Sequence, residues 1–203
     1  MVNKTPRKAK QPKKIAIFAS GQGSTMQTVY QTCANNHLNA EVVLLISNQK
    51  NSGAARFARS KGIPLYIIET ELAENQTAAD EALLKELLAS SIDWILLLGY
   101  TRKIGSKVLS TFKDLIINTH PSLLPKFGGK GFFGRKVHQA VLDSGDLATG
   151  ATVHLVNEEY DSGKILGQVE VPVKLEDSIE SLEKRVKQAE KKYLIEILQA
   201  LWQ

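Results

Sequence analysis

An asparagine and a histidine stand two positions apart at the end of an apolar run, in the segment Asn118-Thr119-His120-Pro121. In an extended chain, side chains two positions apart point to the same side, so the Asn118 amide and the His120 imidazole are expected to face one space. An amide can donate to a developing oxyanion, and an imidazole exchanges protons near neutral pH. Acyl transfer needs both functions, and the pair therefore predicts an acyl-transfer site at the end of this strand.

The rest of the sequence favours a mechanism without an acyl-enzyme or a metal. No Gly-x-Ser-x-Gly nucleophile motif occurs, and the His, Cys, Asp and Glu residues do not fall at metal-ligand spacings. We therefore expect direct attack by a nucleophile of the substrate. His37, expected at a helix end, and His138, expected on a surface helix, are interpreted as structural residues, and Cys33 is interpreted as a packed, inert thiol.

A glycine-containing segment, Ser20-Gly21-Gln22-Gly23-Ser24, follows the first apolar run and precedes a predicted helix. Glycines allow a tight turn there, and the free N–H groups at a helix start attract an anion. The segment is neither a Walker loop nor a complete dinucleotide-binding fingerprint, so neither ATP nor NAD is indicated. Two interpretations stay open, a phosphate-binding turn and a plain strand-to-helix turn with Ser24 as the helix cap.

The elements that must position these residues follow from the alternation of apolar runs with amphipathic segments. Runs that are apolar on both faces predict a mostly parallel sheet covered by helices on both sides. Right-handed crossovers then make the fold a doubly wound, Rossmann-like α/β domain. The expected strands are 15–19, 42–46, 64–68, 94–98 and 115–118, and the expected helices are 25–36, 54–62, 82–88 and 104–109.

Ligands bind such sheets at the carboxyl ends of the strands, which are expected here at Ser20-Gly21, Gly99-Tyr100 and Asn118–His120. After residue 120 the pattern changes. Alternating residues over 151–156 and 165–171 predict an antiparallel addition to the sheet, and apolar residues spaced by three, four or seven predict a long terminal helix from Ile179. No repeat or second domain is visible, and residues 13–203 are predicted to form a single domain.

The net charge of +5 is concentrated at the start of the chain, because residues 1–14 contain six Lys and Arg and no acid. Removing those six charges leaves residues 15–203 at about −1, so no nucleic-acid partner is expected. Residues 1–12 offer almost nothing apolar to bury and are predicted to be a disordered basic leader. No apolar run approaches the roughly 18 residues of a membrane span, so no membrane partner is expected. A single cysteine favours a reducing compartment, and we expect a cytoplasmic protein.

Four segments in this order give a specific resemblance: 18–24 (Phe-Ala-Ser-Gly-Gln-Gly-Ser), 99–102 (Gly-Tyr-Thr-Arg), 118–125 (Asn-Thr-His-Pro-Ser-Leu-Leu-Pro), and Thr152-Val153-His154 followed by 160–163 (Tyr-Asp-Ser-Gly). Together they resemble the successive sequence blocks of the phosphoribosylglycinamide formyltransferase family, within the folate-dependent formyltransferase superfamily. The resemblance covers roughly residues 13–202 and implies the formyltransferase fold.

The resemblance also implies a reaction and the residues that carry it. The family transfers the formyl group of 10-formyltetrahydrofolate, its co-substrate, to the glycinamide amine of phosphoribosylglycinamide in de novo purine biosynthesis, without a metal. In this mechanism, Asn118 and protonated His120 donate to the oxyanion of a tetrahedral intermediate. Asp161 pairs with His120, raises its pKa and organises a water for proton transfer. The acceptor substrate would be bound by Gly23, Ser24, Thr25, Lys187 and Glu190. The folate would be bound by Thr101, Arg102, Lys103, Ile104, Asn118, Asn157, Glu158, Glu159, Tyr160 and Asp161.

The sequence departs from the family pattern at three places. Thr25 stands where the family usually has Asn, Gln76 stands where an arginine is often found, and the segment Gly128–Gly134 is longer than in many relatives. Two alternatives therefore stay open. The first is a formyltransferase that acts on another amine, such as an amino sugar. The second is a non-catalytic phosphoribosyl- or folate-binding protein. In each case the partners are small molecules, and the chain is expected to be a monomer or a homodimer.

Overall fold

The computed structural model describes residues 11–68 and 76–202, apart from the side chain of Gln76. Seven strands form one sheet in the order β3-β2-β1-β4-β5-β6-β7. The first five strands are parallel, and β6 and β7 are antiparallel additions beside β5. The prediction of a doubly wound, mostly parallel sheet with an antiparallel C-terminal part is confirmed.

The parallel half of the sheet alternates strands with helices, as the apolar runs predicted. The predicted third strand, 64–68, is shorter in the structure, where it spans Leu65–Ile67. The strands are β1 Lys13–Phe18, β2 Ala40–Ser47, β3 Leu65–Ile67, β4 Trp94–Leu97 and β5 Ile116–His120. The helices between them are α1 Ser24–Ala34, α2 Gly53–Lys61, α4 Gln76–Ala89 and α5 Ser106–Thr111.

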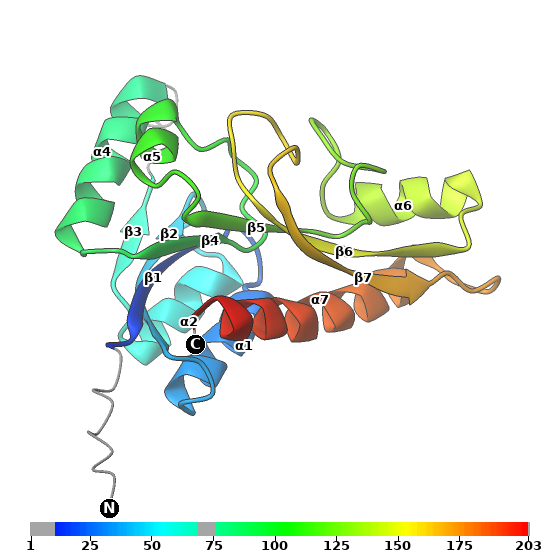
Figure 1. Cartoon of the computed structure of the whole chain (residues 1–203), viewed down its shortest axis with the longest axis horizontal. Helices are drawn as coiled ribbons and strands as arrows, with labels where there is room; N and C mark the ends of the chain where they lie inside the picture. The colour runs from blue at the N-terminus through cyan, green and yellow to red at the C-terminus, as the bar shows by residue number, and fades with distance from the viewer. Residues whose placement is uncertain (1–10, 69–75, 203) are drawn as a thin grey trace, which may run out of the picture.

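Both faces of the sheet are buried, because successive strand residues point to opposite sides and both sets are apolar. On β1, Ile15 and Ile17 pack into one core with α1, α2 and the end of α7, the terminal helix Ile179–Trp202. Ala16 and Phe18 pack into a second core with α4 and α5. Figure 1 shows this arrangement, with α4 and α5 on one side of the sheet and α1, α2 and α7 on the other.

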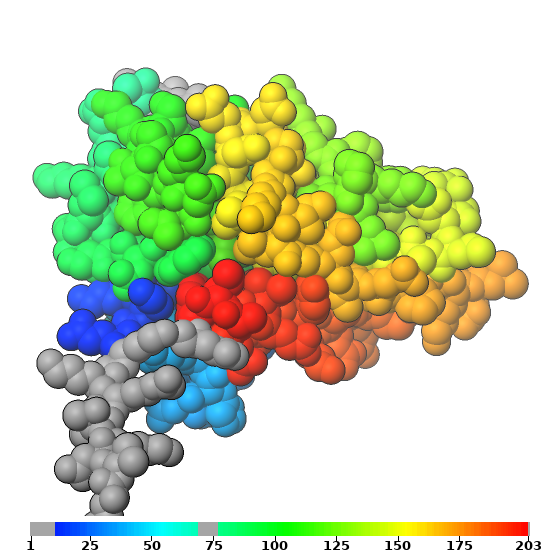
Figure 2. Space-filling view, in the orientation of Figure 1, coloured from blue at the N-terminus to red at the C-terminus, as the bar shows by residue number. Residues whose placement is uncertain are grey.

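The antiparallel half consists of α6 Arg135–Ser144, β6 Ala148–Leu155, β7 Ile165–Pro172 and α7. A third apolar cluster joins α6, β6, β7 and the first half of α7, through residues that include Val141, Ala151 and Leu182. In the space-filling view, α7 runs along the lower part of the molecule beneath β7 and the connection from β6 (Figure 2). The terminal helix therefore reaches from the parallel half of the sheet to the antiparallel half.

Strand order reverses between β1 and β4, which are neighbours although β2 and β3 separate them in sequence. The chain segments that leave these strands are tied together at this point. The Ser20 amide donates to the Gly99 carbonyl at 3.2 Å, the Ser20 hydroxyl donates to Asn48 Oδ1 at 2.6 Å, and the Thr101 amide donates to the Ser20 hydroxyl at 3.3 Å. A crevice at such a reversal is the usual ligand site of a doubly wound sheet.

Within the part of the chain that the structure describes, no helix combines the length and the apolar character needed to cross a membrane.

Candidate active site

The carboxyl ends of the parallel strands open into a cleft of about 660 Å³. Segments from both halves of the fold line it: residues 21–25, 97–104, 118–121, 129–134 and 156–161, together with His154 from β6 and with His138, Lys187 and Glu190 from helices. Every residue that the sequence analysis assigned to catalysis, to the acceptor substrate or to the folate lines this one cleft. The Gly128–Gly134 segment also reaches it, since Gly129 to Gly134 form part of the wall.

The start of α1 faces the cleft without a side-chain cap. Its N-cap is Gly23, with a φ of 73°, and no side chain accepts a hydrogen bond from the first turn. The alternative in which Ser24 caps this helix is therefore wrong, because Ser24 is already the first helical residue. A Cβ at Gly23 would lie 2.7 Å from the Ala54 Cβ, so only glycine fits this turn against α2. The free amides of the first turn form a ready anion site.

Asn118 and His120 meet at the end of β5, on the side where Asp161 lies. The Asn118 Nδ2 atom is 3.5 Å from Asp161 Oδ1, and the His120 Nδ1 atom is 3.4 Å from Asp161 Oδ2. Thr119, between them, points the other way and donates to Glu190 Oε1. The alternation expected of an extended strand thus places the amide and the imidazole together.

Asp161 is fixed in a turn between β6 and β7, where its own φ is 54°. The Gly129 amide donates to Asp161 Oδ2 at 2.9 Å, and His154 Nε2 lies 3.6 Å from Asp161 Oδ1. Burial acts to raise the pKa of Asp161. The contacts with His154, His120 and the Gly129 amide outweigh that effect and hold the pKa below its ordinary value. The carboxyl is therefore ionised at neutral pH.

The pKa of His120 is set by two opposing effects, and the rise expected from its carboxylate partner is the smaller of them. Burial lowers the pKa of His120 and outweighs Asp161, which acts in the opposite direction. The ring also contacts the Phe127 carbonyl through Nε2 at 2.8 Å, and this contact requires a proton on Nε2. His120 is therefore neutral at neutral pH, with its Nδ1 lone pair on the side of Asp161.

His154 belongs to this cluster, although the sequence analysis gave it no role. It lies on β6 opposite Asn118 in the antiparallel pairing, and it is 1% exposed. Its Nδ1 donates to the Leu155 carbonyl at 2.8 Å, and its Nε2 contacts the Asn118 amide nitrogen over 3.0 Å. This contact fixes the orientation of the Asn118 amide. The only sequence signal was the occurrence of His154 in the Thr152-Val153-His154 segment.

Glu190 is a nearly buried carboxylate on α7, and it is 8% exposed. The Thr119 hydroxyl donates to its Oε1 at 3.1 Å, and the Thr25 hydroxyl donates to the same atom at 3.3 Å. Burial raises the pKa of Glu190, and the two hydroxyls and the nearby lysines oppose the rise. Thr25, where the family usually has Asn, thus contacts Glu190 in this chain.

The residues assigned to the folate form a separate part of the cleft wall. Thr101 to Lys103 are exposed and precede the buried Ile104, and the segment Asn157–Tyr160 is exposed. The Lys103 ammonium lies 5.9 Å from the centre of the Tyr160 ring. Gln76, where an arginine is often found, has a side chain outside the described residues. Within residues 11–68 and 76–202, no group of three or more His, Cys, Asp and Glu residues is placed to hold a metal ion.

His138 was expected on a surface helix, but the structure buries it. It is 1% exposed and lines the cleft beside Phe133 and Gly134, and its Nδ1 has no hydrogen-bond partner among the described residues. Burial lowers the pKa of His138.

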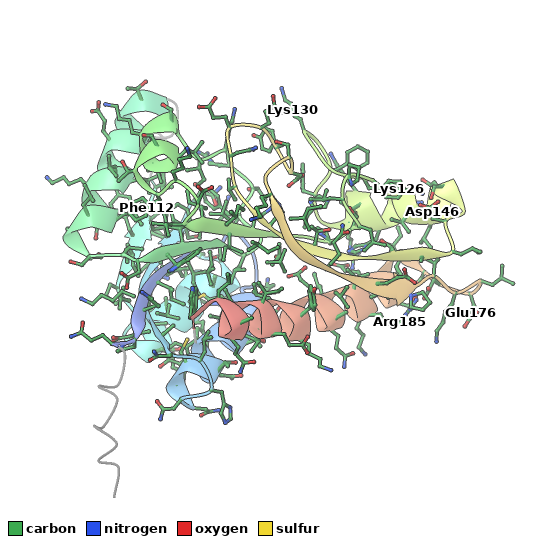
Figure 3. All side chains as sticks on the ribbon, in the orientation of Figure 1. Phe112, Lys126, Lys130, Asp146, Glu176 and Arg185 are labelled. Atoms are coloured by element: carbon green, nitrogen blue, oxygen red, sulfur yellow. The ribbon has the colours of Figure 1, made fainter. Side chains whose placement is uncertain are left out.

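The Gly128–Gly134 segment begins just after an ion pair that ties Lys126 to Asp146 at 2.9 Å. The two side chains point toward each other in Figure 3.

The chain is similar to known proteins in both sequence and fold. Residues 13–198 match the formyl transferase family. The chain is 42% identical to the chloroplastic phosphoribosylglycinamide formyltransferase of Arabidopsis thaliana over 190 residues, which are 93% of this chain but only 65% of that protein. It is 36% identical to the phosphoribosylglycinamide formyltransferase of Haemophilus influenzae, over 88% of this chain and 82% of that protein. Among solved structures it is similar to glycinamide ribonucleotide transformylase 1 of Geobacillus kaustophilus. The TM-score is 0.87 and the identity 33%, over 95% of this chain and all of that one.

Proposed function

Because the chain belongs to the formyl transferase family, we propose that it transfers the formyl group of 10-formyltetrahydrofolate to the amine of phosphoribosylglycinamide, in purine biosynthesis. The observation that supports this most directly is the cleft itself. It places an amide and an imidazole within 3.5 Å of the same carboxylate, and its wall also contains an uncapped helix start. The three side chains suit formyl transfer, and the uncapped helix start suits a phosphate.

The acceptor substrate would lie along α1 and α7. Its phosphate would accept hydrogen bonds from the amides of Gly23, Ser24 and Thr25, where the helix dipole also favours an anion. Lys187 adds a positive charge to the same cleft, and Glu190 offers a carboxylate to the remainder of the molecule. This placement leaves the amine end free to reach Asn118 and His120.

The folate would lie against Thr101–Ile104 and Asn157–Asp161. A cleft of about 660 Å³ is within the usual range for sites that hold small organic ligands, roughly 300–1,000 Å³. The exposed backbone and side chains of these two segments offer hydrogen bonds to a polar ring. When bound, the folate supplies an activated formyl group.

The transfer forms a bond between the amine nitrogen and the formyl carbon and breaks the bond from that carbon to the folate nitrogen. One proton must move from the amine to the folate nitrogen. Neutral His120 is in the form that accepts this proton, directly or through a water beside Asp161, and Asp161 stabilises the imidazolium that results. The proton then passes to the leaving nitrogen.

Asn118 would donate to the formyl oxygen as negative charge develops on it. Its nitrogen lies 3.0 Å from His154 Nε2 and 3.5 Å from Asp161 Oδ1, so the hydrogen bond to the formyl oxygen would replace the longer contact, with Asp161. Preorganised donors of this kind are the main electrostatic contribution to acyl transfer. We propose that His154 is the residue that aims this amide.

A direct test is to mix the protein with 10-formyltetrahydrofolate and one amine at a time, and to follow the release of tetrahydrofolate. The amines are phosphoribosylglycinamide, a phosphorylated amino sugar and glycinamide without the phosphoribosyl group. We expect efficient turnover with phosphoribosylglycinamide alone. Preference for the amino sugar would identify a different acceptor. Binding of folate and phosphoribosylglycinamide without release of product would identify a non-catalytic binding protein.

We also propose that the partners of this chain are these small molecules, and that it acts in the cytoplasm as a monomer or a homodimer.

A further inference from the structure

Three elements meet at the Glu190 carboxylate. Thr25 belongs to the first turn of α1, Thr119 belongs to β5 between the two catalytic side chains, and Glu190 belongs to α7. Both threonine hydroxyls donate to the same atom, Oε1, at 3.3 and 3.1 Å. Residues 165 and 71 positions apart in the sequence are thereby joined inside the cleft wall.

The two contacts fix which oxygen a ligand can use. A carboxylate oxygen has two lone-pair directions, and here both directions on Oε1 receive a hydroxyl proton. A hydrogen-bond donor on a substrate must therefore go to Oε2. The carboxylate also cannot rotate about its terminal bond without losing both contacts, so its plane is set before a substrate arrives.

We propose that Thr25 and Thr119 are positioning residues, which hold Glu190 in one orientation so that Oε2 accepts a hydrogen bond from a hydroxyl or N–H group of the acceptor substrate. This inference rests on the proposed function for the identity of the acceptor. The threonines themselves need not touch the substrate through their hydroxyls, since those are already committed to Oε1.

The same contacts favour the charged form of a carboxylate that burial would otherwise neutralise. Burial raises the pKa of Glu190, and the hydroxyls of Thr119 and Thr25 lower it. The charged groups that act on it, Lys187 and Lys191, lie on its own helix, whereas α1 and β5 contribute uncharged hydroxyls. Because both hydroxyls donate to Oε1, a proton on Glu190 would sit on Oε2 and make that oxygen a donor, so orientation and charge serve the same contact.

The test compares three substitutions. Thr25→Val removes the hydroxyl and keeps the branched shape, and Thr25→Ser keeps the hydroxyl. Thr32→Val is the matched control on the same helix, because the Thr32 hydroxyl donates only to the Thr28 carbonyl of its own turn, at 2.8 Å. We expect Thr25→Val to raise the KM for phosphoribosylglycinamide about 10-fold, the size of a hydrogen bond to a charged group. The KM for folate should stay within twofold. Thr25→Ser, which keeps the hydroxyl, should restore most of the acceptor affinity that Thr25→Val loses, and the control Thr32→Val should behave like the unsubstituted protein.

A second readout does not depend on turnover. The folded pKa of Glu190 is raised, so the protein loses stability as pH rises through that pKa, and the Thr25 hydroxyl offsets part of the loss. The melting temperature of Thr25→Val should therefore fall further below that of the unsubstituted protein at pH 8 than at pH 4. Thr32→Val should show a difference that does not change with pH.

The outcomes separate this inference from the proposed function. If the unsubstituted protein does not turn over, the proposed function fails, and the pH-dependent difference in melting temperature still decides whether the threonines hold an ionised Glu190. If turnover occurs and Thr25→Val changes neither the acceptor KM nor the pH dependence of stability, the inference is overturned. Thr119→Val gives the same comparison from the other hydroxyl if Thr25→Val does not fold.

Discussion

His120 and Asp161 combine a neutral imidazole with an ionised carboxylate in a nearly buried contact. Burial lowers the pKa of His120, and the surrounding donors keep the pKa of Asp161 low, so the pair carries one negative charge at neutral pH. Such a pair accepts a proton from an attacking amine more readily than an equally buried imidazole without a carboxylate, because Asp161 stabilises the imidazolium that forms. Loss of His120 should therefore lower kcat, whereas loss of the Asp161 charge should also shift the pH dependence of kcat.

Substitution of His120 by alanine should reduce kcat at least about 100-fold, the usual loss when a general acid–base is removed. The fold should persist, because the ring lies at the end of β5 against the cleft and outside the three apolar clusters. Steady-state kinetics and the melting temperature measure the two effects. His37→Ala, which removes an exposed imidazole at the end of α1, is the control. Turnover of His120→Ala at the unsubstituted rate would remove His120 from the mechanism.

Asp161→Asn should change the pH profile as well as the rate. Neutral His120 is the active form, so kcat falls as pH drops through the His120 pKa. Asp161 raises that pKa against the larger effect of burial, and without its charge the pKa falls further. The acidic limb of the profile should thus move to lower pH, while kcat at pH 7 drops about 100-fold because the imidazolium loses its anion. An acidic limb that stays in place would mean that Asp161 does not act on His120.

The spacing of Asn118 and His120 was enough to predict their common direction, because strand alternation is a local property. The places of His154 and His138 in the cleft could not be predicted in the same way. His154 faces Asn118 only because β6 pairs with β5 in one particular register, and a one-residue shift would turn it to the other face of the sheet. His138 is buried in the structure, and the charged residues that act on it include Glu183 and Lys187 of α7, whose packing against α6 no local pattern encodes.

Among the elements, the strands were predicted closely and the loops were not. Apolar runs such as Ile15–Ala19 and Ile95–Leu98 are visible in the sequence because both faces of the parallel strands are buried. The path of Gly129–Gly134 follows from three glycines with positive φ and from contacts with Asp161 and α6. No periodicity in the sequence encodes such a path.

The short helix α5 depends on a carboxylate from α4. Asp80 is 5% exposed, and it accepts hydrogen bonds from the Lys107 amide at 2.7 Å and the Val108 amide at 3.3 Å. A Cβ at Gly105 would lie 2.1 Å from the Asp80 Cγ, so the carboxylate is packed directly against the helix start. The segment Thr101–Ile104, which we propose to bind the folate, immediately precedes this start, and its position depends on the same contact.

Asp80→Ala should therefore weaken both α5 and folate binding. Loss of a helix-capping carboxylate costs about 1 kcal/mol, and more where the freed amides stay buried. We expect a lower melting temperature and a several-fold higher KM for folate, with the acceptor KM unchanged. The matched control is Glu81→Ala, which removes an exposed ion pair to Lys107 between the same two helices and should cost under about 0.5 kcal/mol. Equal effects of the two substitutions would contradict this account of the folate segment.

At the scale of the whole molecule, the excess of positive charge lies at the start of the chain, whereas the residues that line the cleft come later in the sequence. Residues 1–12 contain four Lys and Arg, and the prediction of a disordered leader there falls almost entirely outside the described residues. The sheet begins at Lys13, whose amide donates to the Asn39 carbonyl at 3.0 Å, and the cleft begins at Gly21. Neither the described sheet nor the cleft wall includes a residue before these positions.

We therefore predict that removal of residues 1–12 leaves the KM for folate and the KM for the acceptor within about twofold, a change of under roughly 0.4 kcal/mol. Both proposed substrates are anions, however, and four positive charges on the leader would increase their local concentration. Such steering acts over a distance of about 10 Å at 0.1 M salt and weakens as ionic strength rises. Kinetics of the shortened and the full chain at low and high salt separate the two cases. A KM that rises on truncation at low salt, and returns to the full-chain value at high salt, would show that the leader attracts the substrates, whereas equal constants at both salt concentrations would confine substrate recognition to the cleft.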